Sequence, residues 1–262
     1  MGATKPLGII TGTIALLTVT AAVAQTPPAT PAPSPGEIVA AAPPSDWTSI
    51  APSDLLVMDL APVKRQPRRV IIQLIPAPFS QGWVGNIRKL AAAKWWDGTS
   101  VNRVQDNYVV QWGDATERKP LPEGLVTISE ADYVLSETAL EQWLDDQPEP
   151  SAMEAAAGAQ AAAEQAMSQA LWRKKDAYAD STEHFLGWPI GTSRKGDAIG
   201  SWPVHCYGMV GVGRNLSPDT GSGAELYTVI GHAPRHLDRN IALVGRVIEG
   251  MEHLSSLPRG TG

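Results

Sequence analysis

Two blocks of short, β-branched apolar runs, separated by residues 115–207, constrain the fold of this chain more than any other feature of its sequence. In the first block, residues 54–60, 69–75 and 101–111 have the composition of strands, and residues 86–91 have the apolar spacing of a helix. In the second block, residues 227–230 and 241–244 have strand character, and residues 247–257 are expected to form a helix that ends at Pro258. Two strand-rich blocks around an irregular insertion predict a β-rich α+β domain.

The insertion, about residues 115–207, differs in composition from the two blocks. Ser151 and Glu154 form a capping-box pattern before an alanine-rich stretch, which predicts a helix over 151–175. A second helix is expected over residues 137–144. Glycine and proline are scattered through residues 187–203, and this part is expected to be mostly loop.

The N-terminal residues have the pattern of an export signal. Lys5 precedes an apolar run over 9–22, and Ala22-Val23-Ala24 fits the small-residue rule for cleavage, so residues 1–24 are expected to be a signal peptide removed before Gln25. The alternative is an uncleaved anchor helix, but the run is short and diluted by threonines. Residues 25–53 are rich in proline and alanine, which predicts an extended tether. We expect a periplasmic protein that is not membrane-bound after cleavage.

Charge and cysteine content exclude other classes. The net charge of -6 disfavours nucleic-acid binding, which needs a basic surface. The single cysteine, Cys206, excludes an intramolecular disulfide scaffold. His232 and His236 have the spacing of a helical metal pair, but Pro234 lies between them and no third ligand is evident, so no metal site is expected. We expect a monomer.

Several segments, in the correct order, resemble the cyclophilin family of peptidyl-prolyl cis/trans isomerases. Residues 54–60 and 69–75 look like its opening hairpin, and residues 86–90 look like its first helix. In the first block, residues 96–104 resemble the family's Tyr-Asp-Gly-Thr run that ends in Phe-His-Arg, and residues 108–114 resemble Phe-Met-x-Gln-Gly-Gly-Asp. In the second block, residues 208–212 resemble Gly-x-x-Ser-Met, and residues 223–227 resemble Gly-Ser-Gln-Phe-Phe. Residues 236–251 resemble the family's Leu-Asp followed by Phe-Gly-x-Val-x-x-Gly-Met. The resemblance implies a mainly β fold with flanking helices: a cyclophilin-like closed β-barrel over residues 54–262, carrying the insertion.

The family's chemistry is rotation about an Xaa-Pro amide, which has a barrier of about 18–20 kcal/mol. It needs an apolar socket for the proline ring and a fixed donor near the prolyl nitrogen, but no metal or cofactor. By resemblance Arg103 is the donor, and Gln111 binds the substrate backbone or orients Arg103. The resemblance also implies that proline-containing polypeptides contact Tyr108, Val109, Leu226, Tyr227 and Leu237 in the socket, and Asn102, Glu225 and His236 beside it.

Some positions depart from the family pattern. Asn102 replaces a histidine, His236 replaces an aromatic residue, Trp112 replaces a glycine, and Ile241 stands where a histidine is common. We therefore expect reduced catalysis, with a catalytically weak module that binds proline-containing segments as the alternative. The family's last barrel strand has no counterpart before Gly262. Either the sequence is a fragment, which we favour, or an element of the insertion closes the barrel edge.

Overall fold

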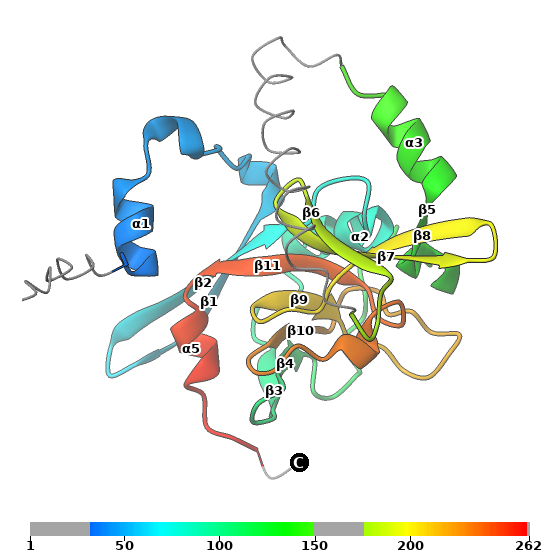
Figure 1. Ribbon diagram of the computed structural model, residues 1–262. Helices are drawn as coiled ribbons and strands as arrows, with labels where there is room; N and C mark the ends of the chain where they lie inside the picture. The colour runs from blue at the N-terminus through cyan, green and yellow to red at the C-terminus, as the bar shows by residue number, and fades with distance from the viewer. Residues whose placement is uncertain (1–31, 149–175, 261–262) are drawn as a thin grey trace, which may run out of the picture. The chain divides into compact units, whose positions relative to one another are not determined.

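The computed structural model describes residues 32–148 and 176–260, in two compact units that divide after Thr48 (Figure 1). The expected signal peptide, residues 1–24, and the expected alanine-rich helix, residues 151–175, lie outside the described residues. No helix in the described ranges is long and apolar enough to cross a membrane.

The first unit contains a helix where an extended tether was expected. Helix α1 (Pro35–Ala41) begins after Ser34, whose hydroxyl accepts from the backbone of Glu37 while the Glu37 carboxylate accepts from the backbone of Ser34. This capping box and a proline in the first turn favour helix initiation in an otherwise proline-rich stretch. A 3-10 turn, η1 (Pro44–Asp46), follows.

The second unit is built on a curled sheet of seven antiparallel strands (Figure 1). After a 3-10 turn, η2 (Pro52–Asp54), the chain forms β1 (Leu55–Val63), β2 (Gln66–Leu74), β3 (Ser100–Val104), β4 (Val109–Gly113), β9 (Met209–Val212), β10 (Leu226–Val229) and β11 (Leu243–Glu249). Their order is β1-β2-β11-β9-β10-β4-β3, so β2 pairs with β11 and β4 pairs with β10. The two strand-rich blocks of the sequence therefore form one sheet, which confirms the mainly β prediction.

Helix α2 (Gln81–Ala92) covers the core and includes the expected residues 86–91. Trp83, Val84, Ile87 and Leu90 are fully buried, at the spacing of one helical face. Asn86 is buried too, and its side-chain amide exchanges two hydrogen bonds of 2.9 Å with the backbone of Val126. The helix thereby fixes the loop that follows β4.

Among the described strands, none pairs with the outer edges of β1 or β3, and the sheet is open between them. Two neighbouring cavities of about 600 and 350 Å³ lie along this opening, where residues 56–61 of β1 face Trp96, Thr99 and Trp112. The strands of the insertion belong to a separate sheet and do not fill it. The expected barrel is thus a curled, open sheet in the described part of the chain.

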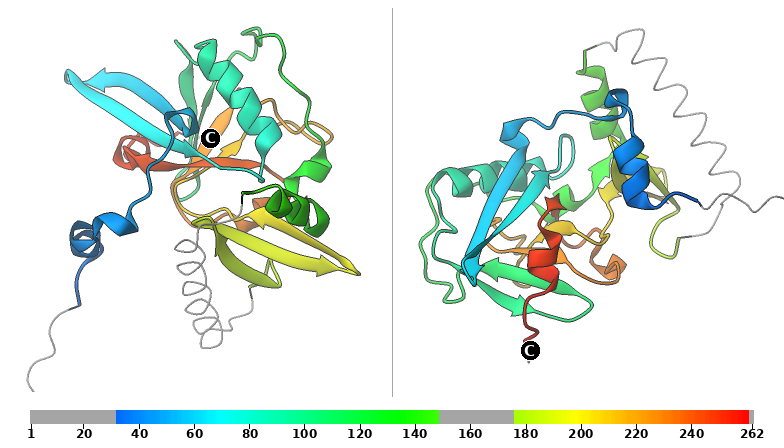
Figure 2. Two further views of the ribbon diagram at one scale, coloured as in Figure 1. Left: turned by 90° about the horizontal axis from the view of Figure 1, so that it is seen from above. Right: turned by 90° about the vertical axis from the view of Figure 1, so that its left-hand side faces the viewer.

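The insertion contains a second sheet where loop was expected. Its strands are β5 (Leu135–Ser136), β6 (Ser181–Phe185), β7 (Trp188–Lys195) and β8 (Ala198–Pro203), in the order β5-β8-β7-β6 (yellow and green in Figure 2). The prediction of loop over residues 187–203 was wrong, because the glycines of this segment make a hairpin turn and a close packing contact and do not interrupt the strands. Gly196, with φ 63°, makes the tight turn between β7 and β8, and Gly191 lies against the buried Trp202 ring.

Two helices flank these sheets. Helix α3 (Glu137–Asp145) follows a 3-10 turn, η3 (Glu130–Tyr133), and confirms the helix expected over 137–144. The helix expected over 247–257 is limited to α5 (Met251–Ser255), because β11 continues to Glu249. Val247 pairs with Ile72 of β2, and Gly250, with φ 81°, then turns the chain close against the backbone of Arg69.

Candidate active site

A row of side chains crosses three neighbouring strands at the centre of the candidate site. Arg103 on β3 lies opposite Gln111 on β4, and Gln111 lies opposite Tyr227 on β10. Directly opposed residues of an antiparallel sheet project to the same face. The sheet register therefore brings together a guanidinium, an amide and an aromatic ring from distant parts of the sequence.

A small cavity of about 150 Å³ lies on this row. It contains six of the predicted site residues, Arg103, Tyr108, Val109, Gln111, Tyr227 and Leu237, together with Gly213, Arg214 and Ile241. Cavities for drug-sized ligands are typically about 300–1,000 Å³. This cavity therefore fits one side chain of a polypeptide better than a free small molecule.

A β-bulge places Arg103 in the row and removes Asn102 from it. Val101 pairs with Trp112, and Arg103 pairs with Gln111, so Asn102 is the extra residue and has no partner on β4. The Asn102 amide instead donates a 3.0 Å hydrogen bond to Glu225 Oε1. Asn102 is exposed and outside the cavity, which differs from the expected substrate contact.

Glu225 and His236 lie beside the cavity. Glu225 lines a neighbouring cavity of about 370 Å³, and Gly213 and Arg214 contribute to both cavities. His236 is exposed, and its ring is stacked on Tyr108 with the centroids 6.1 Å apart. Neither residue lines the 150 Å³ cavity itself.

Leu226 does not line the cavity, contrary to the prediction. Its side chain is 1% exposed and packs in the main core, whereas Tyr227 packs with Val109 and Val229 in a separate apolar cluster. Successive residues of a strand face opposite sides of the sheet. Only one of the pair 226 and 227 can therefore reach the cavity, and it is the tyrosine.

Arg103 is held by a residue that sequence reasoning missed. Its guanidinium donates to Gln105 Oε1, not to Gln111, and lies over the Tyr108 ring with Cζ 5.7 Å from the centroid. Within the described part of the chain, the Gln111 side chain makes no hydrogen bond, so its amide is available to a ligand. Arg214, a second missed residue, places another guanidinium on the cavity, fixed by the backbone and side-chain oxygens of Asn240.

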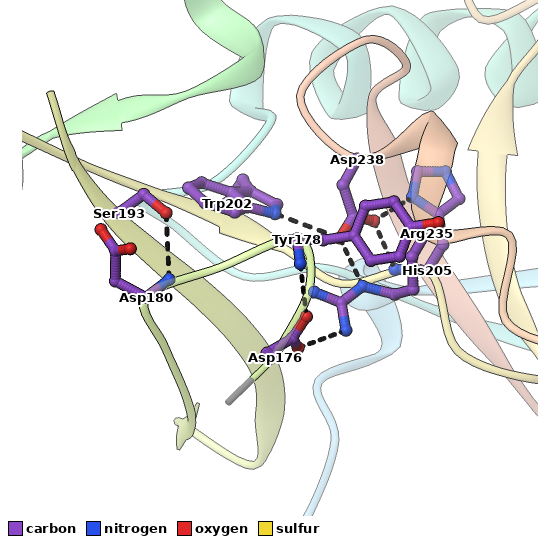
Figure 3. A network of polar contacts seen from close by, with 8 residues as sticks. All are labelled: Asp176, Tyr178, Asp180, Ser193, Trp202, His205, Arg235 and Asp238. Carbon is purple, nitrogen blue, oxygen red and sulfur yellow. Dashed lines mark hydrogen bonds and ion pairs between the residues drawn. The ribbon is translucent and has the colours of Figure 1, made fainter. Parts of the chain in front are cut away.

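A mostly buried polar network joins the insertion to the turn that carries Arg235 and Asp238 (Figure 3). The Asp238 carboxylate accepts from His205 Nδ1 at 2.8 Å, from Trp202 Nε1 at 3.3 Å and from Arg235 Nε at 2.6 Å. Burial would raise the pKa of Asp238, but the hydrogen bonds from His205 and Arg235 outweigh it and hold that pKa below its usual value. Burial lowers the pKa of His205, which keeps its imidazole neutral.

The same network reaches the cavity through Tyr227. His205 Nε2 lies 2.8 Å from the Tyr227 hydroxyl, and burial raises the pKa of Tyr227 well above its usual value. A tyrosine where the family pattern has phenylalanine needs a partner for its hydroxyl, and this was the available signal for a buried polar residue. The sequence did not indicate which residue supplies it.

Fold and site together define a class: a curled antiparallel sheet that presents an arginine and an amide at a small cavity with polar and apolar walls. The family model described as cyclophilin type peptidyl-prolyl cis-trans isomerase/CLD matches residues 70–262. The chain therefore belongs to the cyclophilin-type peptidyl-prolyl cis-trans isomerase family. Membership supports isomerase activity and the binding of proline-containing polypeptides.

A solved structure shows the same fold. It is that of cyclophilin AquaCyp293 from Hirschia baltica, which is 21% identical and has a TM-score of 0.57, over 82% of this chain and 71% of that chain. No curated protein matches the chain. The structural likeness covers a larger share of the chain than the family match and supports the cyclophilin-like fold.

Proposed function

We propose that this chain catalyses cis/trans exchange of Xaa-Pro bonds by holding the proline ring in the 150 Å³ cavity and directing Arg103 at the prolyl nitrogen. The observation that carries the proposal is the row Arg103, Gln111 and Tyr227 across β3, β4 and β10. At one end of the row is the permanently charged guanidinium of Arg103, and at the other end is the aromatic ring of Tyr227. A polypeptide with proline in the cavity would thus have its Xaa-Pro amide beside the guanidinium.

The chemistry follows from the electronic change during rotation. As the amide twists, resonance is lost and the prolyl nitrogen gains a lone pair, so a donor aimed at that nitrogen stabilises the twisted state more than either planar state. Arg103 can supply this donor because a guanidinium stays charged and presents several N–H groups in a fixed fork. On binding, it would exchange the Gln105 acceptor for the substrate.

Gln111 would fix the rest of the substrate. Its amide can donate to and accept from a peptide backbone, and it is flanked by Arg103 on one side and Tyr227 on the other. A backbone held there keeps one side of the Xaa-Pro bond still while the other rotates. This restraint is the positioning contribution to catalysis.

The test is the exchange rate of a short Ala-Xaa-Pro-Phe peptide with the chain starting at Gln25. Arg103→Ala is expected to lower kcat/KM by about 100-fold, the usual effect of removing one preorganised donor. Arg118→Ala, at an exposed arginine outside the cavity, is the matched control and should keep the wild-type rate. Circular dichroism must show that all three are folded. A folded wild-type protein without activity would favour the alternative, a module that binds proline-containing segments.

We also propose that the substrates are exported polypeptides. The support is the N-terminal pattern of Lys5, the apolar run over 9–22 and Ala22-Val23-Ala24. Expression of the whole chain in a bacterium should yield periplasmic protein whose mass corresponds to a start at Gln25. Ala24→Leu should leave an uncleaved precursor. Full-length protein in the cytoplasm would contradict export.

A further inference from the structure

One aromatic side chain that lines the 150 Å³ cavity has its polar atom directed away from the cavity, into the protein. The Tyr227 ring lines the cavity, is 4% exposed and packs on Val109 and Leu237. Its hydroxyl lies 2.8 Å from His205 Nε2, and the two ring planes differ by only 9°. The two rings are therefore nearly parallel, and the distance between the hydroxyl oxygen and Nε2 is that of an ordinary hydrogen bond.

The position of the proton on the His205 ring is determined by Asp238, which contacts Nδ1. Asp238 Oδ1 accepts from both Nδ1 and the backbone N–H of His205, at 2.8 and 3.1 Å. An ionised carboxylate can only accept, and burial lowers the pKa of His205, so the single proton of the neutral imidazole is on Nδ1 and Nε2 is an acceptor. Tyr227 must therefore be the donor, and its hydroxyl hydrogen is fixed in direction.

His205 is itself rigidly held. It is 0% exposed, and Asp238 is tied to Trp202 of β8 and to Arg235, which also pairs with Asp176 at 2.6 Å (Figure 3). These partners come from the insertion and from the turn that carries His236 and Leu237. The second sheet and the cavity wall thus share one network of hydrogen bonds.

We propose that His205 is a positioning residue of the proline cavity: by accepting the Tyr227 hydrogen bond it fixes the ring against which proline packs. The inference rests on the proposed function and deepens it. His205 does not touch the substrate. A phenylalanine at 227 would be held by packing alone, whereas the tyrosine also has a hydrogen bond from its hydroxyl to His205. Residues of the insertion, through their contacts with Asp238 and Arg235, help to hold His205 in place.

Two substitutions of His205 test the hydrogen bonds of its two ring nitrogens separately. The Asn amide reaches the place of Nδ1 and can keep the Asp238 bond but not the Tyr227 bond, while the Gln amide reaches the place of Nε2 and can still accept from Tyr227. His205→Asn and Tyr227→Phe should each lower kcat/KM about fivefold, the effect of one lost hydrogen bond between neutral groups. His205→Gln should retain more activity than His205→Asn. His184→Asn, at an exposed histidine of β6, should have no effect.

The kinetic signature distinguishes positioning from general damage. The socket holds proline in the ground state and the twisted state alike, so the loss should be in KM with kcat kept, whereas Arg103→Ala should lower kcat. In the double variant His205→Asn/Tyr227→Phe the losses should not add, because both remove the same bond. In the wild type, the nitrogen NMR shift of His205 Nε2 should be that of an acceptor and should move in Tyr227→Phe.

The outcomes separate the two proposals. An active wild type with an inactive Arg103→Ala, but with Tyr227→Phe and His205→Asn at the wild-type KM, overturns the positioning role and leaves the isomerase. Additive losses in the double variant, or a His205 shift that does not respond to Tyr227→Phe, also overturn it. A folded wild type that does not accelerate exchange overturns both. If His205→Asn does not fold, Tyr227→Phe and the NMR shift still decide.

Discussion

Arg103 and Gln111 face each other across β3 and β4, yet the guanidinium of Arg103 donates to Gln105, two residues along its own chain. The bulge at Asn102 explains the arrangement, since it turns Arg103 toward the cavity rim while Gln105 begins the hairpin turn. The Arg103 side chain is thus directed toward the cavity but remains exposed to solvent. Its resting partner is a neutral amide in contact with solvent, which a substrate can displace at small cost.

Arg103→Lys should lower kcat/KM by about tenfold or more, because lysine keeps the charge and loses the planar fork. Gln105→Leu removes only the resting partner and should change kcat/KM by less than about fivefold. Both are measured with the peptide exchange assay. A loss in Gln105→Leu as large as that in Arg103→Ala would show that Gln105 acts during the reaction.

Gly211→Ala should destabilise the protein by about 1–3 kcal/mol, because a Cβ there would overlap the ring and hydroxyl of Tyr227 on the next strand. Urea unfolding measures the change. Gly85→Ala is the matched control: it lies in helix α2 with open space around it and should stabilise by about 0.5–1 kcal/mol. Adding Tyr227→Leu should recover part of the Gly211→Ala loss; no recovery would place the strain elsewhere.

Arg235→Met should cost about 3 kcal/mol in the free energy of unfolding, since the buried Asp238 carboxylate loses its cationic partner. The comparison is Arg69→Met, which breaks the exposed pair with Asp59 and should have a much smaller effect, because solvent screens that pair. Equal effects of the two substitutions would mean that Asp238 is stabilised sufficiently by His205 and Trp202.

Stability should fall as the pH is lowered from 7.5 to 5. The folded-state pKa of His205 is below its unfolded value, so the unfolded chain takes up the proton first, from about pH 6.5 downward. The lowered pKa of Asp238 adds nothing in this range, since its contribution is fully present above about pH 4 and is lost only as the pH falls below that toward the folded-state value. Urea unfolding at pH 7.5, 6 and 5 tests this, and His205→Asn should flatten the fall between pH 7 and 5.

The sequence predicted the main sheet and most of the cavity because both depend on local signals. The β-branched runs located the strands, and the motifs around Arg103, Gln111 and Tyr227 located the row. What it did not reveal depends on long-range contacts. The β7–β8 hairpin is fixed by the burial of Trp188, Ile190 and Trp202, whose neighbouring glycines and prolines suggested loop. His205 lies outside every recognised motif, and only its distance to Tyr227 gives it a role.

The contact between Tyr227 and Gly211 ties together positions on neighbouring strands. The family pattern resembled by this chain has phenylalanine and serine at these two places, so here the hydroxyl has moved from β9 to the ring on β10. A side chain at 211 conflicts with the ring as it lies here, and the hydroxyl at 227 needs the acceptor at 205. The three positions therefore form one structural unit: we expect relatives with tyrosine at the place of 227 to carry glycine at 211 and an acceptor at 205 as well, and a change at one of them to become neutral only after the others have changed.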